Sequence, residues 1–172
     1  NRMIQKLAER LVNVDLLDKA SDVLGHQVKF RLKGEEKAAV GTKLALIRLI
    51  ARDPQGALDD LRDSYHLKVS LEIEDDRRRI RAKAEFELGK ANDAIALLAG
   101  DVSREADQLR SAIYFRERNW GEAAKVYQRL VGGPPEEGET VDADSGRTAL
   151  LWAVALKLNR DEEGLRQLFD LY

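Results

Sequence analysis

Apolar residues recur every three to four positions along most of the chain. Near its beginning, Ile4, Leu7 and Leu11 follow this spacing, and similar series continue to the last residues. The spacing places apolar side chains on one face of an α-helix. One segment, 67–73, alternates between apolar and polar residues, but it has no second strand to pair with and is predicted to be a loop leading into a helix. The pattern therefore predicts an all-α fold.

Boundary signals divide this pattern into short helices. Asp53-Pro54 joins an N-cap acceptor to a proline at a position where its missing N–H is not needed. Asn119, followed three residues later by a glutamate, has the spacing of a capping box. Gly34, Gly89 and Gly100 stand where helices are expected to end. Together these signals predict helices at about 2–13, 16–31, 35–52, 54–65, 72–89, 91–99, 103–117, 120–131, 143–158 and 161–171, with a glycine- and proline-rich loop at 132–138.

When the helices are aligned in consecutive pairs, the same kinds of residue fall at the same positions. One position in the second helix is small, the position four residues later is large, and two positions in the first helix, twelve and eight residues earlier, match as well. A small residue is needed where two helix axes approach closely, and a large one fills the gap a turn further on. The four series are Ala20, Ala57, Ala94, Ala123, Gly164; Leu24, Leu61, Leu98, Tyr127, Leu168; Ala8, Ala45, Ala82, Ser111, Trp152; and Val12, Leu49, Phe86, Phe115, Leu156.

This repeated pair resembles the tetratricopeptide repeat (TPR) family, whose unit is a helix–turn–helix of about 34 residues. The segment most similar to the family pattern is 109–135, through Tyr114, Asn119-Trp120, Ala123-Ala124, Tyr127 and Pro134-Pro135. The small residues are 37, 37, 29 and 41 positions apart, so the repeats are degenerate. Arg78, Arg81 and Asp107 are polar where the family usually has large apolar residues. Trp152 replaces an alanine or serine, which predicts that the fifth pair is spaced differently or ends the stack.

The resemblance implies a right-handed α-solenoid of about five antiparallel helix pairs, built as a single domain over 1–172. The helix pattern is already running at Ile4, and the chain ends on Leu168, Phe169, Leu171 and Tyr172, which are apolar. Solenoids usually carry a polar capping face at each end. We therefore expect 1–172 to be a fragment of a longer chain.

Composition narrows the classes of function. The 172 residues are 44% apolar and 35% charged, with no run long enough to cross a bilayer. The net charge is −2, with acids and bases interleaved, which gives no electrostatic case for binding nucleic acid or an anionic membrane. The absence of cysteine excludes disulfides and thiolate metal sites, and it fits oxidising and reducing compartments equally well.

Candidate chemistry is sparse. His26 and His66 stand alone, without a second ligand at metal-binding spacing. No serine has the context of a nucleophile elbow, and the run 132–135 lacks the lysine and helix start of a phosphate loop. Neighbouring acids such as Asp59-Asp60 are typical of solvated helix faces. We therefore predict a protein that is not an enzyme, with no catalytic, cofactor-binding or metal-ligating residues and no cofactor.

The run 77–83 contains four arginines and a lysine, and in isolation it resembles a nucleic-acid patch. Glu74 and Asp75 precede Arg78 and Arg79 by four residues, the spacing of favourable helical ion pairs. No aromatic residue is interleaved to stack on bases. The run therefore predicts a solvated or partner-facing helix.

The resemblance to TPR proteins implies a scaffold or adaptor that holds a peptide segment or a partner helix on the concave surface formed by the first helices. The lysines and asparagines with which some family members clamp C-terminal carboxylates are not found in this chain. In the family register, the residues of the third and fourth pairs that would face a partner are Arg79, Lys83, Phe86, Gln108, Phe115 and Arg116. Cationic and aromatic groups suit a segment with acidic and apolar side chains.

Alternatives to this interpretation remain open. The arginines could satisfy local acids, and the phenylalanines could be buried. The chain could also be a helical self-assembly domain that associates through its terminal helices, or an accessory segment of a larger enzyme.

Overall fold

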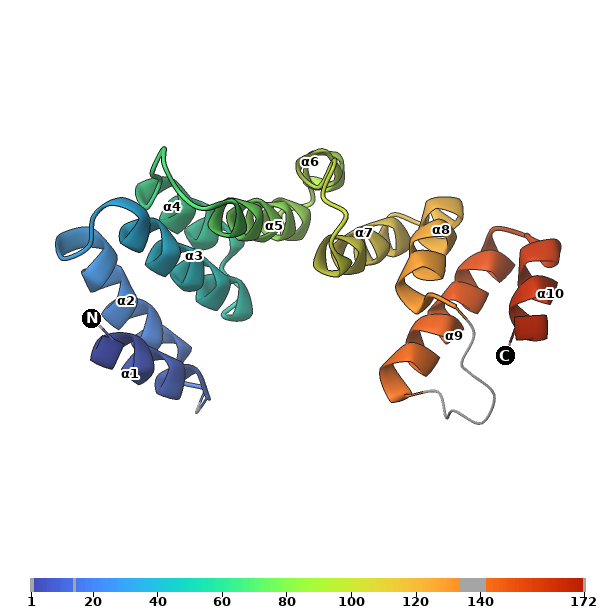
Figure 1. Cartoon of the computed structure of the whole chain (residues 1–172), viewed down its shortest axis with the longest axis horizontal. Coiled ribbons are helices and arrows are strands. Elements are labelled where there is room, and N and C mark those ends of the chain that lie inside the picture. Colours follow the sequence, from blue (N-terminus) through green and yellow to red (C-terminus); the bar gives the residue numbers. More distant parts are fainter. Residues whose placement is uncertain (1, 14, 134–141, 172) are drawn as a thin grey trace. The chain divides into compact units, whose positions relative to one another are not determined.

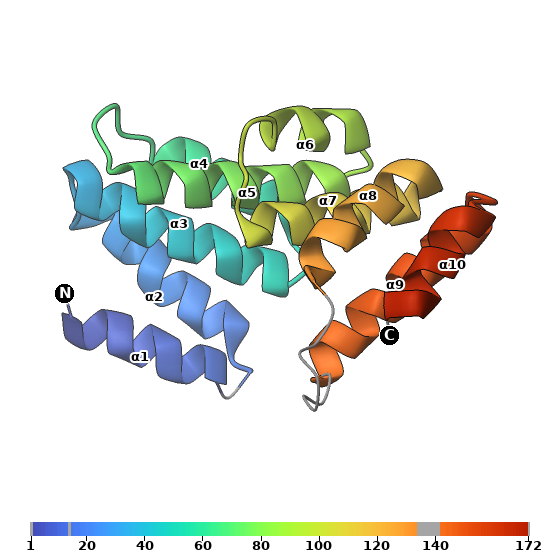
Figure 2. The ribbon, with the colours of Figure 1, turned by 45° about the vertical axis from the view of Figure 1, so that its right-hand side comes forward.

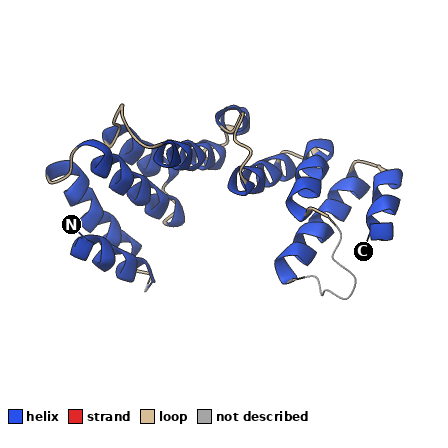
Figure 3. Ribbon diagram, viewed as in Figure 1, coloured by secondary structure: helices blue, strands red, loops and turns tan. Residues whose placement is uncertain are grey.

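The computed structural model describes residues 2–13, 15–133 and 142–171, and every regular element in them is a helix (Figure 3). The helices are α1 (Arg2–Asn13), α2 (Leu17–Phe30), α3 (Gly34–Ile50), α4 (Pro54–Asp63), α5 (Leu71–Glu87), α6 (Ala91–Leu97), α7 (Arg104–Arg116), α8 (Trp120–Val131), α9 (Ala143–Leu158) and α10 (Glu162–Leu171). The prediction of an all-α fold is confirmed. Of the loop predicted at 132–138, residues from 134 onward lie outside the described residues.

The helices begin where their capping residues stand. Asp53 accepts a hydrogen bond from the Gly56 N–H at 2.8 Å, and Pro54 occupies the first turn of α4. Asn119 accepts one from the Glu122 N–H at 3.4 Å at the start of α8. One predicted boundary is different: Gly34, expected at a helix end, is the first residue of α3 and has a φ of +59°.

Contacts divide the chain into two compact units, Asn1–Ala99 and Gly100–Tyr172. In the first unit each helix from α1 to α6 packs on the next, and α3 also packs on α5 (Figures 1 and 2). In the second unit α7, α8, α9 and α10 pack in the same consecutive order. Antiparallel neighbours of this kind bury the apolar face that each helix carries.

Most of the aligned residues are buried in the cores of the two units. The small residues Ala20, Ala57, Ala94 and Ala123 are 0% exposed, and the large residues four positions later are at most 7% exposed. Because alanine carries no side chain beyond Cβ, the helices of a pair can approach closely at these points. Burial of a large apolar side chain contributes about 1.5–3 kcal/mol. The repeated pattern therefore predicts the core correctly.

The turn inside each pair contains one residue in the left-handed region of φ. These residues are Asp15, Arg52, Gly89, Arg118 and Arg160, with φ between 57° and 84°. An L-residue in this conformation costs about 1–2 kcal/mol, and only one of the five is glycine. The chain therefore turns at the same place in each pair without the glycine that usually marks it.

The fifth pair is spaced differently, as Trp152 predicts. In the first four pairs the left-handed residue lies five positions before the aligned small residue, whereas Arg160 lies only four before Gly164. In this pair the turn residue also lies four positions after the aligned residue Leu156, whereas in the other pairs this distance is three. The first helix of the fifth pair therefore runs one residue further before the turn. Trp152 is 6% exposed and packs into the core with Leu156 and Leu168.

Aromatic rings concentrate in the core of the second unit. The Phe115 ring packs edge-on against Trp120, with centroids 5.1 Å apart, and against Tyr127 at 6.3 Å. Such pairs add about 0.5–1.5 kcal/mol to the burial of the rings. The chain has two tryptophans, Trp120 and Trp152, and both belong to this unit.

Candidate protein-binding surfaces

Three of the six predicted partner-facing residues lie on α5 in the first unit. The Arg79 guanidinium pairs with Asp76 at 2.7 Å, and the Arg79 side chain is 20% exposed. Lys83 is exposed, whereas Phe86 is buried at 8%. The alternative that the arginines satisfy local acids and the phenylalanines are buried is therefore favoured for Arg79 and Phe86. Of these three residues, Lys83 is the exposed one.

The other three lie on α7 in the second unit. Gln108 and Arg116 are exposed, and Phe115 is half-buried against Trp120. The sequence does not predict that Phe115 would be a partner of Trp120. That these exposed residues bind a protein partner stays a prediction.

Arg77 is half-buried, and its guanidinium bonds to groups of the first unit. Its Nη1 donates hydrogen bonds to the Ala38 carbonyl at 3.0 Å, to Thr42 Oγ1 at 3.2 Å and to Ser64 Oγ at 3.1 Å. Its Nη2 donates to the Leu61 carbonyl. Burial lowers the pKa of Arg77 from its ordinary value. Arg77 therefore differs from the rest of the run 77–83, because its guanidinium joins α3, α4 and α5.

The ion pairs beside Arg77 are also closer in sequence than predicted. Arg78 pairs with Asp75, and Arg79 with Asp76, each three residues away rather than four. Both spacings put the two side chains on neighbouring turns of one helix face. The acids of this helix therefore compensate much of the charge of the run.

Two helices approach very closely beside Arg77. Gly41 of α3 is buried, and a Cβ built on it would overlap Cβ and Oγ of Ser64, at the end of α4. Ser64 is 0% exposed and donates a hydrogen bond to the Asp60 carbonyl at 2.7 Å. The serine is thus held by its own bonds, and only glycine fits opposite it.

A cleft of about 750 Å³ opens over α5 in the first unit. Its walls come from α4, from the connection between α4 and α5, and from α6. It is lined by Gln55, Leu58, Asp59, Leu61, Arg62, Tyr65, His66, Leu67, Val69, Glu74, Arg77, Arg78, Arg81, Glu85 and Leu97. A volume of this size is within the range of binding pockets in proteins.

A buried carboxylate, that of Asp107, accepts hydrogen bonds from two arginines in the second unit. Asp107 is 8% exposed and accepts hydrogen bonds from Arg129 Nε and Nη2, both at 2.9 Å, and from Arg110 Nη1 at 2.7 Å. The hydrogen bonds from Arg129, and those from Arg110, hold the pKa of Asp107 below its ordinary value against the opposing effect of burial. Asp107, polar where the family pattern is apolar, therefore links α7 to α8.

Replacing Asp107 with asparagine is expected to lower the free energy of unfolding at pH 7 by about 2 kcal/mol, the scale of hydrogen bonds to charged groups. Because the folded pKa of Asp107 lies below the unfolded one, its contribution is complete above the unfolded pKa and is lost as the pH falls through the folded pKa. Urea unfolding of wild type and Asp107→Asn should therefore converge in acid. Asp170→Asn, an exposed change in the same unit, should behave like wild type throughout; a difference between Asp107→Asn and wild type that stays constant as the pH falls would contradict the role of the carboxylate.

Two further properties bear on function. Within the described ranges, no group of three or more His, Asp or Glu side chains is arranged to hold a metal ion. Over the same ranges, none of the helices combines the length and the apolar character needed to span a membrane.

Comparison with known proteins identifies the fold. No protein-family model matches the sequence, and no curated protein matches it. A solved structure that is similar is a crystal structure of nearly identical TPR-like repeats from a protein described as a kinesin light chain of Podosopora anserina. It superposes with a TM-score of 0.72 at 16% sequence identity, over 98% of this chain and 91% of that one. The chain therefore has a TPR-like helical-repeat fold.

Proposed function

We propose that this chain is a scaffold or adaptor that binds segments of other proteins on the first helices of its pairs. Helical-repeat folds present extended surfaces on which a partner can lie, because each repeat contacts only its neighbours. On several first helices of this chain, exposed side chains are of the kinds that suit protein binding.

The observation that carries the proposal is a row of large apolar residues on α9. Leu150, Val154 and Leu158 follow one another at four-residue spacing and are 65%, 37% and 48% exposed. This spacing puts them on one face of the helix. On α3, Leu46 and Ile50 repeat the arrangement at 43% and 49% exposure. Contiguous exposed apolar side chains are typical of interaction surfaces.

The partner-facing residues of the middle helices supply charge. Lys83 on α5 and Gln108 and Arg116 on α7 are exposed. In the proposed complex these exposed residues orient an acidic segment, whereas Arg79 is paired with Asp76 and Phe86 is buried. Apolar contact then supplies most of the affinity, and charge selects the partner.

The test is affinity capture from a lysate of the source organism, using the tagged chain and an Arg79→Glu, Lys83→Glu, Arg116→Glu variant, with mass spectrometry of the bound proteins. We expect at least one partner whose recovery falls about tenfold or more in the variant, because reversed charges repel an acidic segment. The control reverses three other exposed cations, Lys6, Lys19 and Arg147, and should retain that partner. A folded variant that keeps every partner, or a wild type that captures none reproducibly, would contradict the proposal.

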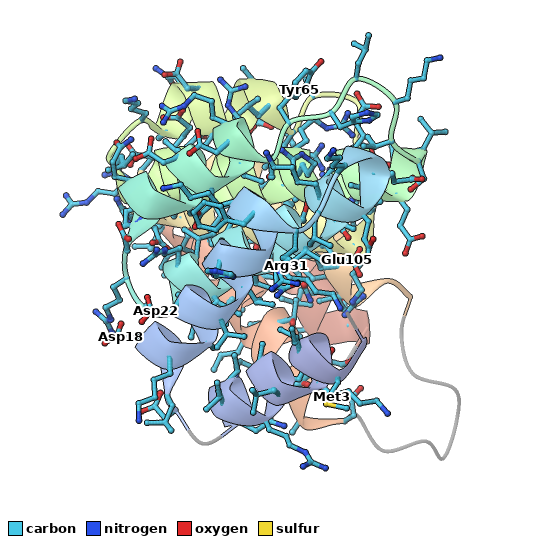
Figure 4. All side chains as sticks on the ribbon, turned by 90° about the vertical axis from the view of Figure 1, so that its left-hand side faces the viewer. Met3, Asp18, Asp22, Arg31, Tyr65 and Glu105 are labelled. Carbon is cyan, nitrogen blue, oxygen red and sulfur yellow. The ribbon has the colours of Figure 1, made fainter. Side chains whose placement is uncertain are left out.

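Self-association through the terminal helices stays a prediction. Met3 on α1 is 83% exposed and Phe169 on α10 is 71% exposed, and Figure 4 shows the Met3 side chain projecting from its helix. Analytical ultracentrifugation of the purified chain would reveal it as a mass that grows with concentration.

A further inference from the structure

We propose that the cleft between α4, α5 and α6 is a second protein-binding site, which takes an acidic segment with a large apolar side chain next to its carboxylate. The residues of the cleft belong to the first unit alone. The site lies on a different face of α5 from Arg79 and Lys83, and it does not depend on any residue of the second unit.

The cleft holds positive charge that no carboxylate compensates. The four acceptors of the Arg77 guanidinium are two backbone carbonyls and two hydroxyls, all neutral. Arg81, one turn further along α5, is exposed and has no ion pair within the described part of the chain. Arg77 is fixed in place by its bonds, so it supplies a positive charge at a set position, while Arg81 can form a forked pair with a ligand carboxylate.

The acids of the cleft are mostly engaged already. Asp59 pairs with Arg62 at 3.0 Å, and Glu85 pairs with Lys90 at 3.0 Å. Glu74 is the remaining carboxylate of the lining. A ligand with one or two carboxylates therefore finds cations to bind, whereas a polyanion such as a nucleic acid finds no continuous run of cations, because acids are interspersed with the arginines of the lining. This charge distribution favours an acidic protein segment over RNA or DNA.

The apolar part of the site lies in the connection between α4 and α5. Tyr65 is 67% exposed and Leu67 is 80% exposed, and Figure 4 shows Tyr65 at the outer edge of the unit. Half-buried Leu58 and Leu97 continue the apolar lining into the cleft. Exposed large side chains of this kind are the anchors that protein interfaces bury.

The connection is held in place before any ligand arrives. His66 Nδ1 and the Lys68 carbonyl are 2.8 Å apart, and the Ser70 N–H donates to Glu35 Oε1 at 2.8 Å. Tyr65 and Leu67 are therefore exposed on an ordered segment, and binding need not order a loose loop first. Preorganisation of this sort raises affinity by removing that entropy loss.

The equivalent place in the second unit is different. Between α8, α9 and α10 the hollow measures about 240 Å³, and no arginine lines it. The cleft in the first unit is thus not a general feature of adjacent helix pairs. It exists where the connection 64–70 joins α4 to α5 and where arginines on one face of α5 line the space.

The test selects ligands from a random library of short linear peptides on the immobilised full chain, with Arg81→Glu protein as the counter-selection. We expect Arg81-dependent peptides in which an aspartate or glutamate neighbours a large apolar residue. In fluorescence anisotropy such a peptide should bind Arg81→Glu and Leu67→Ser proteins about tenfold more weakly than wild type, the scale of losing one charged or apolar anchor. Lys19→Glu, the same charge change at an exposed residue of α2, should leave the affinity close to that of wild type.

Three outcomes would overturn this inference: a library without Arg81-dependent peptides, selected peptides without acidic residues, or a single-stranded oligonucleotide that displaces the peptide at equal concentration. Circular dichroism of each variant checks that it is folded. Because the capture test of the proposed function changes Arg79, Lys83 and Arg116 and leaves Arg81 in place, either proposal can fail while the other stands.

Discussion

Replacing Gly41 with alanine is expected to lower the free energy of unfolding of the first unit by about 3 kcal/mol, at the upper end of overpacking in a core. The new Cβ would overlap Cβ and Oγ of Ser64, which is fully buried. The serine cannot rotate away, because its Cβ position is fixed by the backbone. To admit the methyl group α3 and α4 must separate, and the contacts of Arg77 with both helices would stretch as well.

The matched control is Gly25→Ala in the middle of α2. There a Cβ would lie 3.9 Å from the nearest side-chain atom, which is ordinary van der Waals contact. Since alanine favours a helix interior over glycine by about 0.5–1 kcal/mol, Gly25→Ala should be neutral or stabilising. Urea unfolding followed by circular dichroism measures both variants. A Ser64→Gly change added to Gly41→Ala should restore part of the loss; equal stability of Gly41→Ala and Gly25→Ala would refute the close approach.

Arg77→Met is expected to lower the free energy of unfolding by about 2 kcal/mol. Hydrogen bonds to charged groups contribute about 1.5–3 kcal/mol, and relief of the buried charge offsets part of the loss. Methionine replaces the aliphatic part of the arginine side chain but has no donor for the Ala38 and Leu61 carbonyls or for the hydroxyls of Thr42 and Ser64.

Arg81→Met on the same helix supplies the comparison. Arg81 is exposed and has no bond in the described part of the chain, so this change should stay within about 0.5 kcal/mol of wild type. If thermal and urea unfolding show equal losses for the two variants, Arg77 does not join the three helices in solution.

The repeat pattern was sufficient to predict the fold, because burial in paired helices constrains residue size at fixed positions. Each described helix begins within one residue of its predicted start. The turns were harder. The left-handed conformation that glycine favours is adopted by Arg52, Arg118 and Arg160. An arginine in the sequence does not predict this conformation.

The functional surfaces depend on features that a periodic pattern does not contain. The sequence suggests that 77–83 is one charged run, yet Arg77 points into the unit and Arg81 is exposed. The four neutral acceptors of Arg77 come from α3, from α4 and from the residue that follows α4, so only tertiary packing reveals them. The cleft likewise depends on the connection 64–70, which forms no regular element. The size and the spacing of apolar residues thus predict a core. The bonding partners of a single polar residue such as Arg77 come from other helices, so the sequence pattern does not predict them.

The placement of both tryptophans in one unit has a consequence for how the chain can be observed. Trp120 and Trp152 belong to residues 100–172, so intrinsic tryptophan fluorescence reports on that half alone. Circular dichroism reports on helices in both halves. Denaturation recorded by the two signals therefore distinguishes the halves without a label. Coincident curves mean that the two halves unfold in one cooperative transition, and separated curves give the order in which they unfold.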